Sequence, residues 1–189
     1  MYQCRLVLVL HLLHLFVGAA GLDVRPVWID CDLAVSESLT GTRDIDDALA
    51  LVQVLNSRLT VVGVSTVFGN ALVPDATAAT RRLLARFFPL YTSGVFPGAA
   101  SPLTATPTEA GDPNEAVTAM AAVLRRYAAG SDGRVDLLAL GPITNIAALI
   151  RLHPQLVDRA VGRIVFVGGR RPKQAFRIGT NITLTLADM

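Results

Sequence analysis

The chain has 189 residues, of which 52% are hydrophobic, and this is enough for one domain with a sizeable core. Its formal net charge of +2 comes from sixteen scattered arginines, one lysine and fifteen acidic residues, which disfavours nucleic acid as a main partner. After removal of the N-terminal signal described next, one cysteine and one histidine remain, which excludes an intramolecular disulfide and the usual zinc ligand sets.

The first twenty residues predict a secretory signal peptide. Arg5 precedes an apolar run from Leu6 to Val17, and the small residues of a cleavage site follow. A membrane anchor is the alternative, but the run is shorter than the ~20 residues of a spanning helix and two histidines interrupt it. We therefore expect residues 1–20 to be cleaved from one domain of residues 21–189. The mature chain is then expected to be secreted or periplasmic, without stable membrane insertion.

Apolar runs alternate with helical patterns along the rest of the chain. The predicted strands cover residues 27–30, 59–68, 135–140 and 164–167, with a further short strand within 91–103. The predicted helices cover residues 45–55, 76–88, 114–129 and 144–152. Because strands that alternate with helices are typical of βαβ units, we predict an α/β fold with an open, mainly parallel sheet and helices on both faces.

Polar or glycine residues follow four of the predicted strands. Asp30 and Asp32 end the first strand, and Asn70 follows the second. Thr144-Asn145 comes after "LALGP", and Gly168-Gly169 comes after "IVFV". Ligand sites in open α/β sheets lie beyond the carboxyl ends of the strands. We therefore expect these four stretches to converge at one edge of the sheet and to form the site there.

Five of the twelve aspartates lie between residues 30 and 47. Carboxylates at close range repel one another, and a hard cation such as Ca²⁺ or Mg²⁺ offsets this repulsion. Asp46 and Asp47 are adjacent, so on a helix their side chains point about 100° apart, and one can bind metal while the other faces a substrate. Alternatively, Asp44 caps the helix and this pair serves the helix dipole. That alternative leaves Asp30 and Asp32 unexplained.

The spacing of these motifs resembles that of the calcium-dependent nucleoside hydrolases of the inosine-uridine-preferring type. In that family, a strand ending in Asp-x-Asp is followed by a tight turn and an Asp-Asp-Ala helix. Here "IDCD" and "DIDDALAL" match, whereas the longer loop "LAVSESLTGTR" replaces the turn. The resemblance covers roughly residues 27–177, through "VSTVFGN" at 64–70, "VFPGAASPL" at 95–103, "LALGPITNIA" at 138–147 and "IVFVGG" at 164–169. It implies a Rossmann-like nucleoside hydrolase core.

The resemblance also implies a Ca²⁺ site and its ligands. Asp32 matches the aspartate that binds the ion and acts as general base. Asp47 and the backbone carbonyl of Thr144 match further metal ligands, and Asp30 looks like a residue that orients its neighbours. A metal lowers the pKa of bound water and a carboxylate removes its proton, which agrees with these residue types.

The implied substrate is a small-molecule ribonucleoside. Asp46 and Asn70 match residues that contact the ribose hydroxyls. The implied reaction is hydrolysis of the N-glycosidic bond through an oxocarbenium-like state, whose positive charge nearby carboxylates stabilise. The oligomeric state is left open, with a homo-oligomer among the alternatives.

The motifs correspond to the N-terminal part of the family, whose members are longer, so we expect hydrolysis by the 189-residue chain to be impaired. A non-catalytic secreted protein that binds Ca²⁺ or sugar weakly is the alternative. A haloacid-dehalogenase-like phosphatase also places Asp-x-Asp after a first strand. It is disfavoured because no acidic pair follows Lys173, which is the single lysine.

Overall fold

The computed structural model describes residues 26–34, 44–91, 93–103, 114–130 and 133–167. Several predictions concern residues outside these ranges. They are the signal peptide, most of the loop that precedes the Asp-Asp-Ala helix, and Gly168-Gly169 with the segment that follows.

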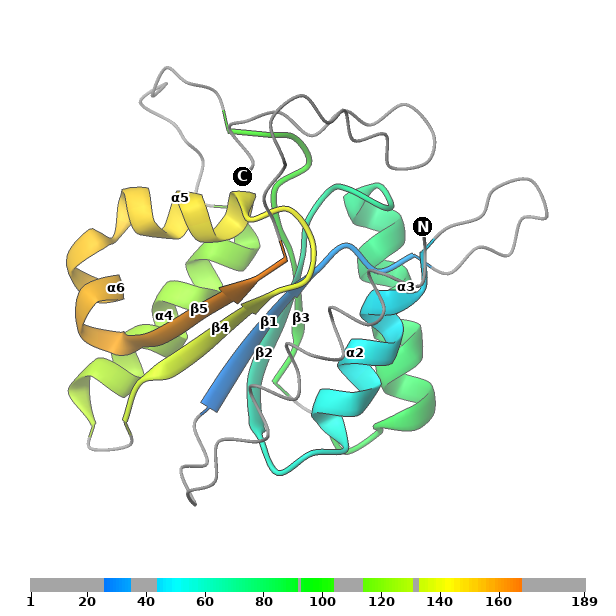
Figure 1. Ribbon diagram of the computed structural model, residues 1–189, viewed down its shortest axis with the longest axis horizontal. Coiled ribbons are helices and arrows are strands. Elements are labelled where there is room, and N and C mark those ends of the chain that lie inside the picture. Colours follow the sequence, from blue (N-terminus) through cyan, green and yellow to red (C-terminus); the bar gives the residue numbers. More distant parts are fainter. Residues whose placement is uncertain (1–25, 35–43, 92, 104–113, 131–132, 168–189) are drawn as a thin grey trace.

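Five parallel strands form one sheet in the order β3-β2-β1-β4-β5 (Figure 1). The strands are β1 (Pro26–Cys31), β2 (Thr60–Thr66), β3 (Val95–Pro97), β4 (Val135–Ala139) and β5 (Val161–Phe166). The chain runs outward from β1 to β3 and then returns to the other side of β1 for β4. This reversal makes the β1–β4 boundary the topological switch point, where open α/β sheets place their ligands.

Helices cover both faces of the sheet, as predicted (Figure 1). On one face, α2 (Asp46–Leu55) and α3 (Val73–Phe87) pack against the sheet. On the other face lie α4 (Glu115–Ala129), α5 (Thr144–Leu152) and α6 (Pro154–Ala160). The fold is therefore the predicted α/β architecture with an all-parallel described sheet.

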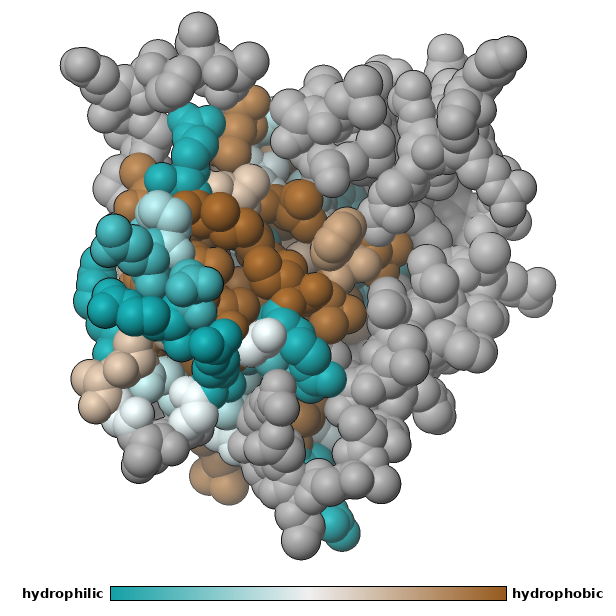
Figure 2. All heavy atoms as spheres, turned by 60° about the vertical axis from the view of Figure 1, so that its left-hand side comes forward, coloured by the Kyte–Doolittle hydropathy of each residue, from teal (hydrophilic) through white to brown (hydrophobic). Residues whose placement is uncertain are grey.

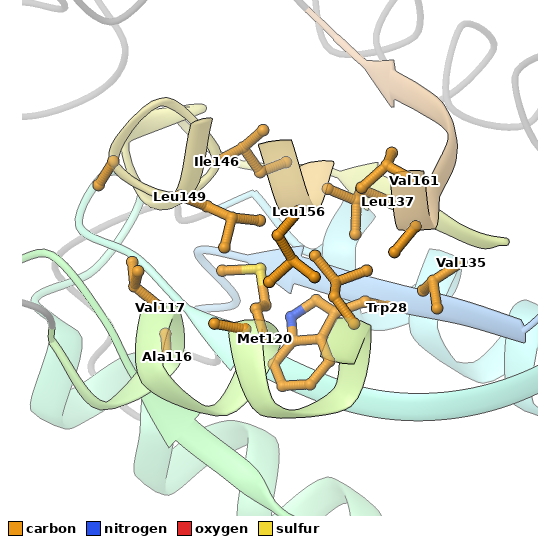
Figure 3. Close-up of a cluster of buried hydrophobic side chains, with 14 of the residues drawn as sticks. Trp28, Ala116, Val117, Met120, Val135, Leu137, Ile146, Leu149, Leu156 and Val161 are labelled. Carbon is orange, nitrogen blue, oxygen red and sulfur yellow. The ribbon is translucent and has the colours of Figure 1, made fainter. Parts of the chain in front are cut away.

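The central strand β1 is buried on both faces. Val27, Ile29 and Cys31 point into the core beneath α2 and α3. Trp28 points to the opposite core, where Figure 3 shows it among side chains from α4, α5 and α6 such as Met120. The "VWI" run has no polar alternation because neither side of this strand meets water.

Helix boundaries agree with the sequence except in two places. Helix α3, the second of the described helices, begins at Val73 rather than at residue 76, with Pro74 in its first turn. Helix α6 was not predicted, and β5 follows it directly from Val161 rather than from residue 164. Seven residues span about two turns, which is too short for a periodic signal, although Pro154 at the helix start marks it.

Gly63 on β2 makes room for the indole of Trp28. A Cβ added at this glycine would lie 2.1 Å from Trp28 Cζ3, and the indole itself stacks on Phe96 with ring centroids 5.6 Å apart. We expect Gly63→Ala to lower the free energy of unfolding by about 1–3 kcal/mol, because the close-packed ring cannot move away. Chemical denaturation measures this loss. Trp28→Phe combined with Gly63→Ala should cost less than the sum of the two single changes, and strict additivity would contradict the steric explanation.

Figure 2 shows the side of the molecule that lies on the left in Figure 1. Apolar side chains gather at the centre of this view, next to hydrophilic ones. The elements on this side include three large apolar residues that are at least 40% exposed, namely Ile150, Leu152 and Phe166. Within the described ranges, no helix is long and apolar enough to cross a membrane.

Candidate functional site

Asp32 lies directly after β1, at the topological switch point, between two glycines from neighbouring strand ends. A Cβ added at Gly69, after β2, would lie 2.0 Å from Asp32 Oδ2. A Cβ added at Gly141, after β4, would lie 3.0 Å from Asp32 Cγ. Gly69 also has a φ of +152°, in the region that favours glycine. The glycines of "VFGN" and "LGP" thus lie where the backbone must come close to the Asp32 carboxylate.

Two backbone amides connect Asp32 to its neighbours. The amide of Asn70 donates to Asp32 Oδ2 at 2.7 Å, and the amide of Asp32 donates to Asp47 Oδ2 at 2.8 Å. The Asp47 carboxylate therefore contacts the backbone of Asp32 itself, and the Asp32 carboxylate contacts the backbone of Asn70. The sequence predicted that the polar groups at these strand ends converge. Asp32 is half-buried and Asp47 is buried.

The segment before α2 is attached to the end of β2 by the side chain of Asn70. Its Nδ2 donates to the Asp44 carbonyl at 2.6 Å, and its Oδ1 accepts from the Asp44 amide at 3.3 Å. The ribose contact that the sequence indicated for Asn70 stays a prediction. The sequence did not indicate these hydrogen bonds to Asp44. Because the side-chain amide of Asn70 binds both the amide and the carbonyl of Asp44, it fixes where α2 begins.

The aspartates at the start of α2 also bind its first amides. Asp44 Oδ1 accepts from the Asp46 amide at 3.3 Å, and Asp46 Oδ1 accepts from the Asp47 amide at 3.0 Å. The N-cap residue itself is Ile45, without a side-chain cap bond. The helix-capping alternative is therefore correct in part. Asp44 accepts a hydrogen bond from the first turn of α2, but it precedes the N-cap residue by one position. Asp46 and Asp47 both lie in the first turn.

Burial and like charge work against the ionised form of Asp47. Its pKa is raised well above the usual range, first by burial and then by the charges of Asp32 and Asp46. A cation beside these groups would reverse this effect, since it favours the ionised form of every carboxylate it contacts.

Asp30 lies at the end of a directed hydrogen-bond chain on the buried side of the same edge. The indole Nε1 of Trp28 donates to Ser65 Oγ at 2.8 Å, and Ser65 Oγ donates to Asp30 Oδ1 at 2.5 Å. Asn145 Nδ2 donates to the same oxygen at 2.9 Å. Asp30 Oδ2 is buried and accepts no hydrogen bond within the described part of the chain.

Burial raises the pKa of Asp30 to about 6, and the nearby charge of Asp32 acts in the same direction. The hydrogen bonds from Ser65 and Asn145 lower it but do not outweigh burial. Ser65 was not singled out in the sequence. A serine within the apolar "VGVSTVF" strand was the available signal, because a buried hydroxyl needs a partner.

Thr144 is the first residue of α5 and is buried, so the structure brings it to the same sheet edge as the aspartates. Oxygen donors such as the Asp32 and Asp47 carboxylates and a backbone carbonyl are those that Ca²⁺ prefers. The donor chemistry and the raised pKa of Asp47 fit a cation. Among the described residues, however, no three His, Cys, Asp or Glu side chains come together as a metal site, so any ion here needs further oxygens.

Comparison with known proteins decides the family. The family model described as "Inosine-uridine preferring nucleoside hydrolase" matches residues 27–188. The chain belongs to this family. The match runs beyond residue 177, where the motifs found in the sequence end, and it contains the strand ends and both carboxylate pairs described above. Nucleoside hydrolases therefore supply the frame for interpreting this site.

Solved nucleoside hydrolases share the fold. An inosine-guanosine nucleoside hydrolase superposes with a TM-score of 0.60 at 24% identity, covering 77% of this chain and 49% of its own. A plant nucleoside hydrolase gives 0.60 at 25%, covering 78% and 48%. An inosine-uridine preferring nucleoside hydrolase from Bacillus anthracis gives 0.54 at 21%, covering 79% and 52%.

An uncharacterized protein of Schizosaccharomyces pombe is 27% identical over 175 residues, which cover 82% of this chain and 48% of that protein. The chain thus spans about half the length of the relatives it matches.

Proposed function

We propose that this chain supplies part of a ribonucleoside hydrolase site that uses Ca²⁺ to activate water. The observation that carries the proposal is the position of Asp32. It lies at the topological switch point, enclosed by Gly69 and Gly141 and joined through its amide to Asp47. A carboxylate placed in this way, on a nucleoside hydrolase fold, is suited to remove a proton from water.

In the proposed reaction, Asp32 orients a water molecule and accepts its proton as the oxygen attacks the anomeric carbon. The bond to the base nitrogen breaks, and the base leaves with the electron pair and takes up a proton. Bound Ca²⁺ would lower the pKa of the attacking water. Asp32, Asp47 and the Thr144 carbonyl would hold the ion, while Asp30 would orient its neighbours through buried hydrogen bonds.

The ribose hydroxyls are assigned to Asp46 and Asn70. Both residues are attached to Asp44, through an amide and a side chain respectively, so they would move together with the start of α2. The carboxylate of Asp46, placed near the sugar, would favour the positive charge of the oxocarbenium-like state. Base specificity does not follow from these contacts.

Ca²⁺ should stabilise the chain. At a concentration of 100 times its dissociation constant, the ion is expected to raise the free energy of unfolding by about 2.7 kcal/mol through mass action. Asp32→Asn and Asp47→Asn should each remove most of this gain, since each takes a charged oxygen from the proposed ligand set. Asp158→Asn, on the exposed side of α6, is the matched control. Equal thermal unfolding of the wild type in Ca²⁺ and in chelator would refute the metal site.

Export is a separate proposal that the apolar N-terminal run supports. Protein secreted from the source cell should begin near residue 20 or 21, because the small residues there suit signal cleavage. N-terminal sequencing measures this directly. An intact Met1 on protein recovered from the cytoplasm would contradict it.

A secreted protein that binds Ca²⁺ or sugar without catalysis is the second candidate. It is favoured by the small number of acidic ligands among the described residues. Ca²⁺ binding without base release, in the chain and in a version extended to the length of its relatives, would decide for this second function.

A further inference from the structure

Asn145, the second residue of α5, has a fully buried side chain that uses its whole hydrogen-bonding capacity. Its Nδ2 donates to Asp30 Oδ1 at 2.9 Å and to the Thr66 carbonyl at 3.1 Å. Its Oδ1 accepts from the Ala99 amide at 2.8 Å and from Asn114 Nδ2 at 3.1 Å. A carboxamide offers two donor hydrogens and two acceptor lone pairs, so all four are engaged.

The orientation of this amide is fixed by its partners. The Ala99 amide can only donate, so it requires the oxygen of Asn145, and the Thr66 carbonyl can only accept, so it requires the nitrogen. Asp30 Oδ1 therefore receives a donor from Asn145. The space is closed as well, because a Cβ added at Gly98 would lie 2.2 Å from Asn145 Nδ2.

The four partners belong to four different parts of the sheet edge. Asp30 is the penultimate residue of β1, Thr66 ends β2, and Ala99 follows β3. Asn114 is the N-cap of α4, and its Oδ1 accepts from the Val117 amide. One buried side chain thus connects the ends of three strands with the starts of two helices. Any shift of α5 along its axis would break these bonds together.

We propose that Asn145 is the positioning residue of this site. By fixing the first turn of α5, it sets where the adjacent Thr144 carbonyl lies relative to the Asp32 and Asp47 carboxylates. This inference rests on the proposed function for its consequence in Ca²⁺ binding. The alignment of the sheet edge follows from the contacts of Asn145 alone, and it holds in the metal-free protein.

Asn145→Asp tests the role with almost no change in volume. The new carboxylate would still accept from Ala99 and Asn114, but the Thr66 carbonyl would lose its donor, and the Asp30 carboxylate would face a like charge with at most one proton shared between the two. The double swap Asp30→Asn with Asn145→Asp restores one donor between the two positions at unchanged net charge. Leu124→Ala, in the buried face of α4, is the control for lost stability without a change at the sheet edge.

Two measurements on the full chain separate positioning from folding. The first is hydrogen exchange, without metal, of the Asp32 and Asn70 amides, whose bonds to Asp47 and Asp32 report the alignment of the site. The second is the dissociation constant for Ca²⁺ by calorimetry. Relative to the buried amides of β1, which report whole-chain unfolding, we expect Asn145→Asp to speed both exchanges by about tenfold or more and Leu124→Ala to change them by less than about twofold. Ca²⁺ binding should weaken by about tenfold or more in Asn145→Asp and change by less than about twofold in Leu124→Ala.

The double swap should recover part of both losses, because it restores the contact between residues 30 and 145 but not the donor to the Thr66 carbonyl, or it should fold where Asn145→Asp alone does not. The inference is wrong if the two amides exchange in Asn145→Asp as they do in Leu124→Ala, or if the swap behaves no better than the single change. A wild-type chain without measurable Ca²⁺ affinity would refute the proposed metal. The exchange rates would still decide the role of Asn145.

Discussion

The 189-residue chain should release little or no free base from inosine or uridine at saturating Ca²⁺. It spans about half the length of its relatives, and among the described residues the proposed ion would have side-chain oxygens from Asp32 and Asp47 alone. Ca²⁺ takes about 6–8 oxygen ligands, so a site with fewer protein ligands holds the ion weakly and leaves the carboxylates less compensated. Exposed apolar side chains such as Phe166 should also promote aggregation.

A chain extended with the C-terminal part of a related nucleoside hydrolase is expected to recover both solubility and turnover. In that extended chain, Asp32→Ala should abolish base release, whereas Asp158→Ala, on the exposed side of α6, should leave it unchanged. The measurement is base release from a nucleoside panel. Robust turnover by the 189-residue chain alone would show that our account of the site is wrong.

Stability of the metal-free protein should fall as the pH rises from about 4 to about 7, and Asp30→Asn should remove part of this fall. The pKa of Asp30 is near 3.8 when unfolded and about 6 when folded, so between these values the folded state holds the extra proton. The contribution of Asp30 is therefore neutral below pH 4 and unfavourable above pH 6. A shift of this size corresponds to on the order of 3 kcal/mol, with burial complete and solvent screening small.

Urea unfolding in chelator at several pH values measures this difference between Asp30→Asn and wild type. Relative to wild type, the variant should gain stability as the pH rises, even if it is less stable at pH 4. Asp75→Asn, on the exposed first turn of α3, serves as the control for removing one carboxylate. Parallel curves for Asp30→Asn and wild type would mean that Asp30 is not the group responsible. The raised pKa of Asp47 acts with the same sign in both proteins.

The centre of the sheet could be predicted from the sequence because β1 and β4 are buried on both faces and appear as continuous apolar runs. The "VWI" of β1 and the "LLA" of β4 are examples. The order of the strands in the sheet could not be predicted from the sequence, since it depends on which hydrophobic faces meet in space. Helix α6 could not be predicted either, because its seven residues are fewer than the roughly 11–18 over which helical periodicity is recognised.

The carboxylates of the site could be found from the sequence because their charge is conspicuous within an apolar surrounding. The groups that hold them in place could not. Ser65 and Asn145 are ordinary polar residues in the sequence, and their importance comes from partners far along the chain. The hydrogen bonds between Asn70 and Asp44 likewise depend on how the segment before α2 approaches the end of β2.

The contact between Asp30 and Asn145 joins residues 115 positions apart, and this has a consequence for synthesis on the ribosome. β1 can pair with β2 early, but its other edge stays open until β4 has emerged, and the amide that connects the strand ends comes later still. Contacts between such distant segments form slowly because loop closure must precede them. The emerging chain therefore presents an open edge of β1 until β4 has followed, and the acidic groups at the strand ends are aligned only after residue 145 has emerged.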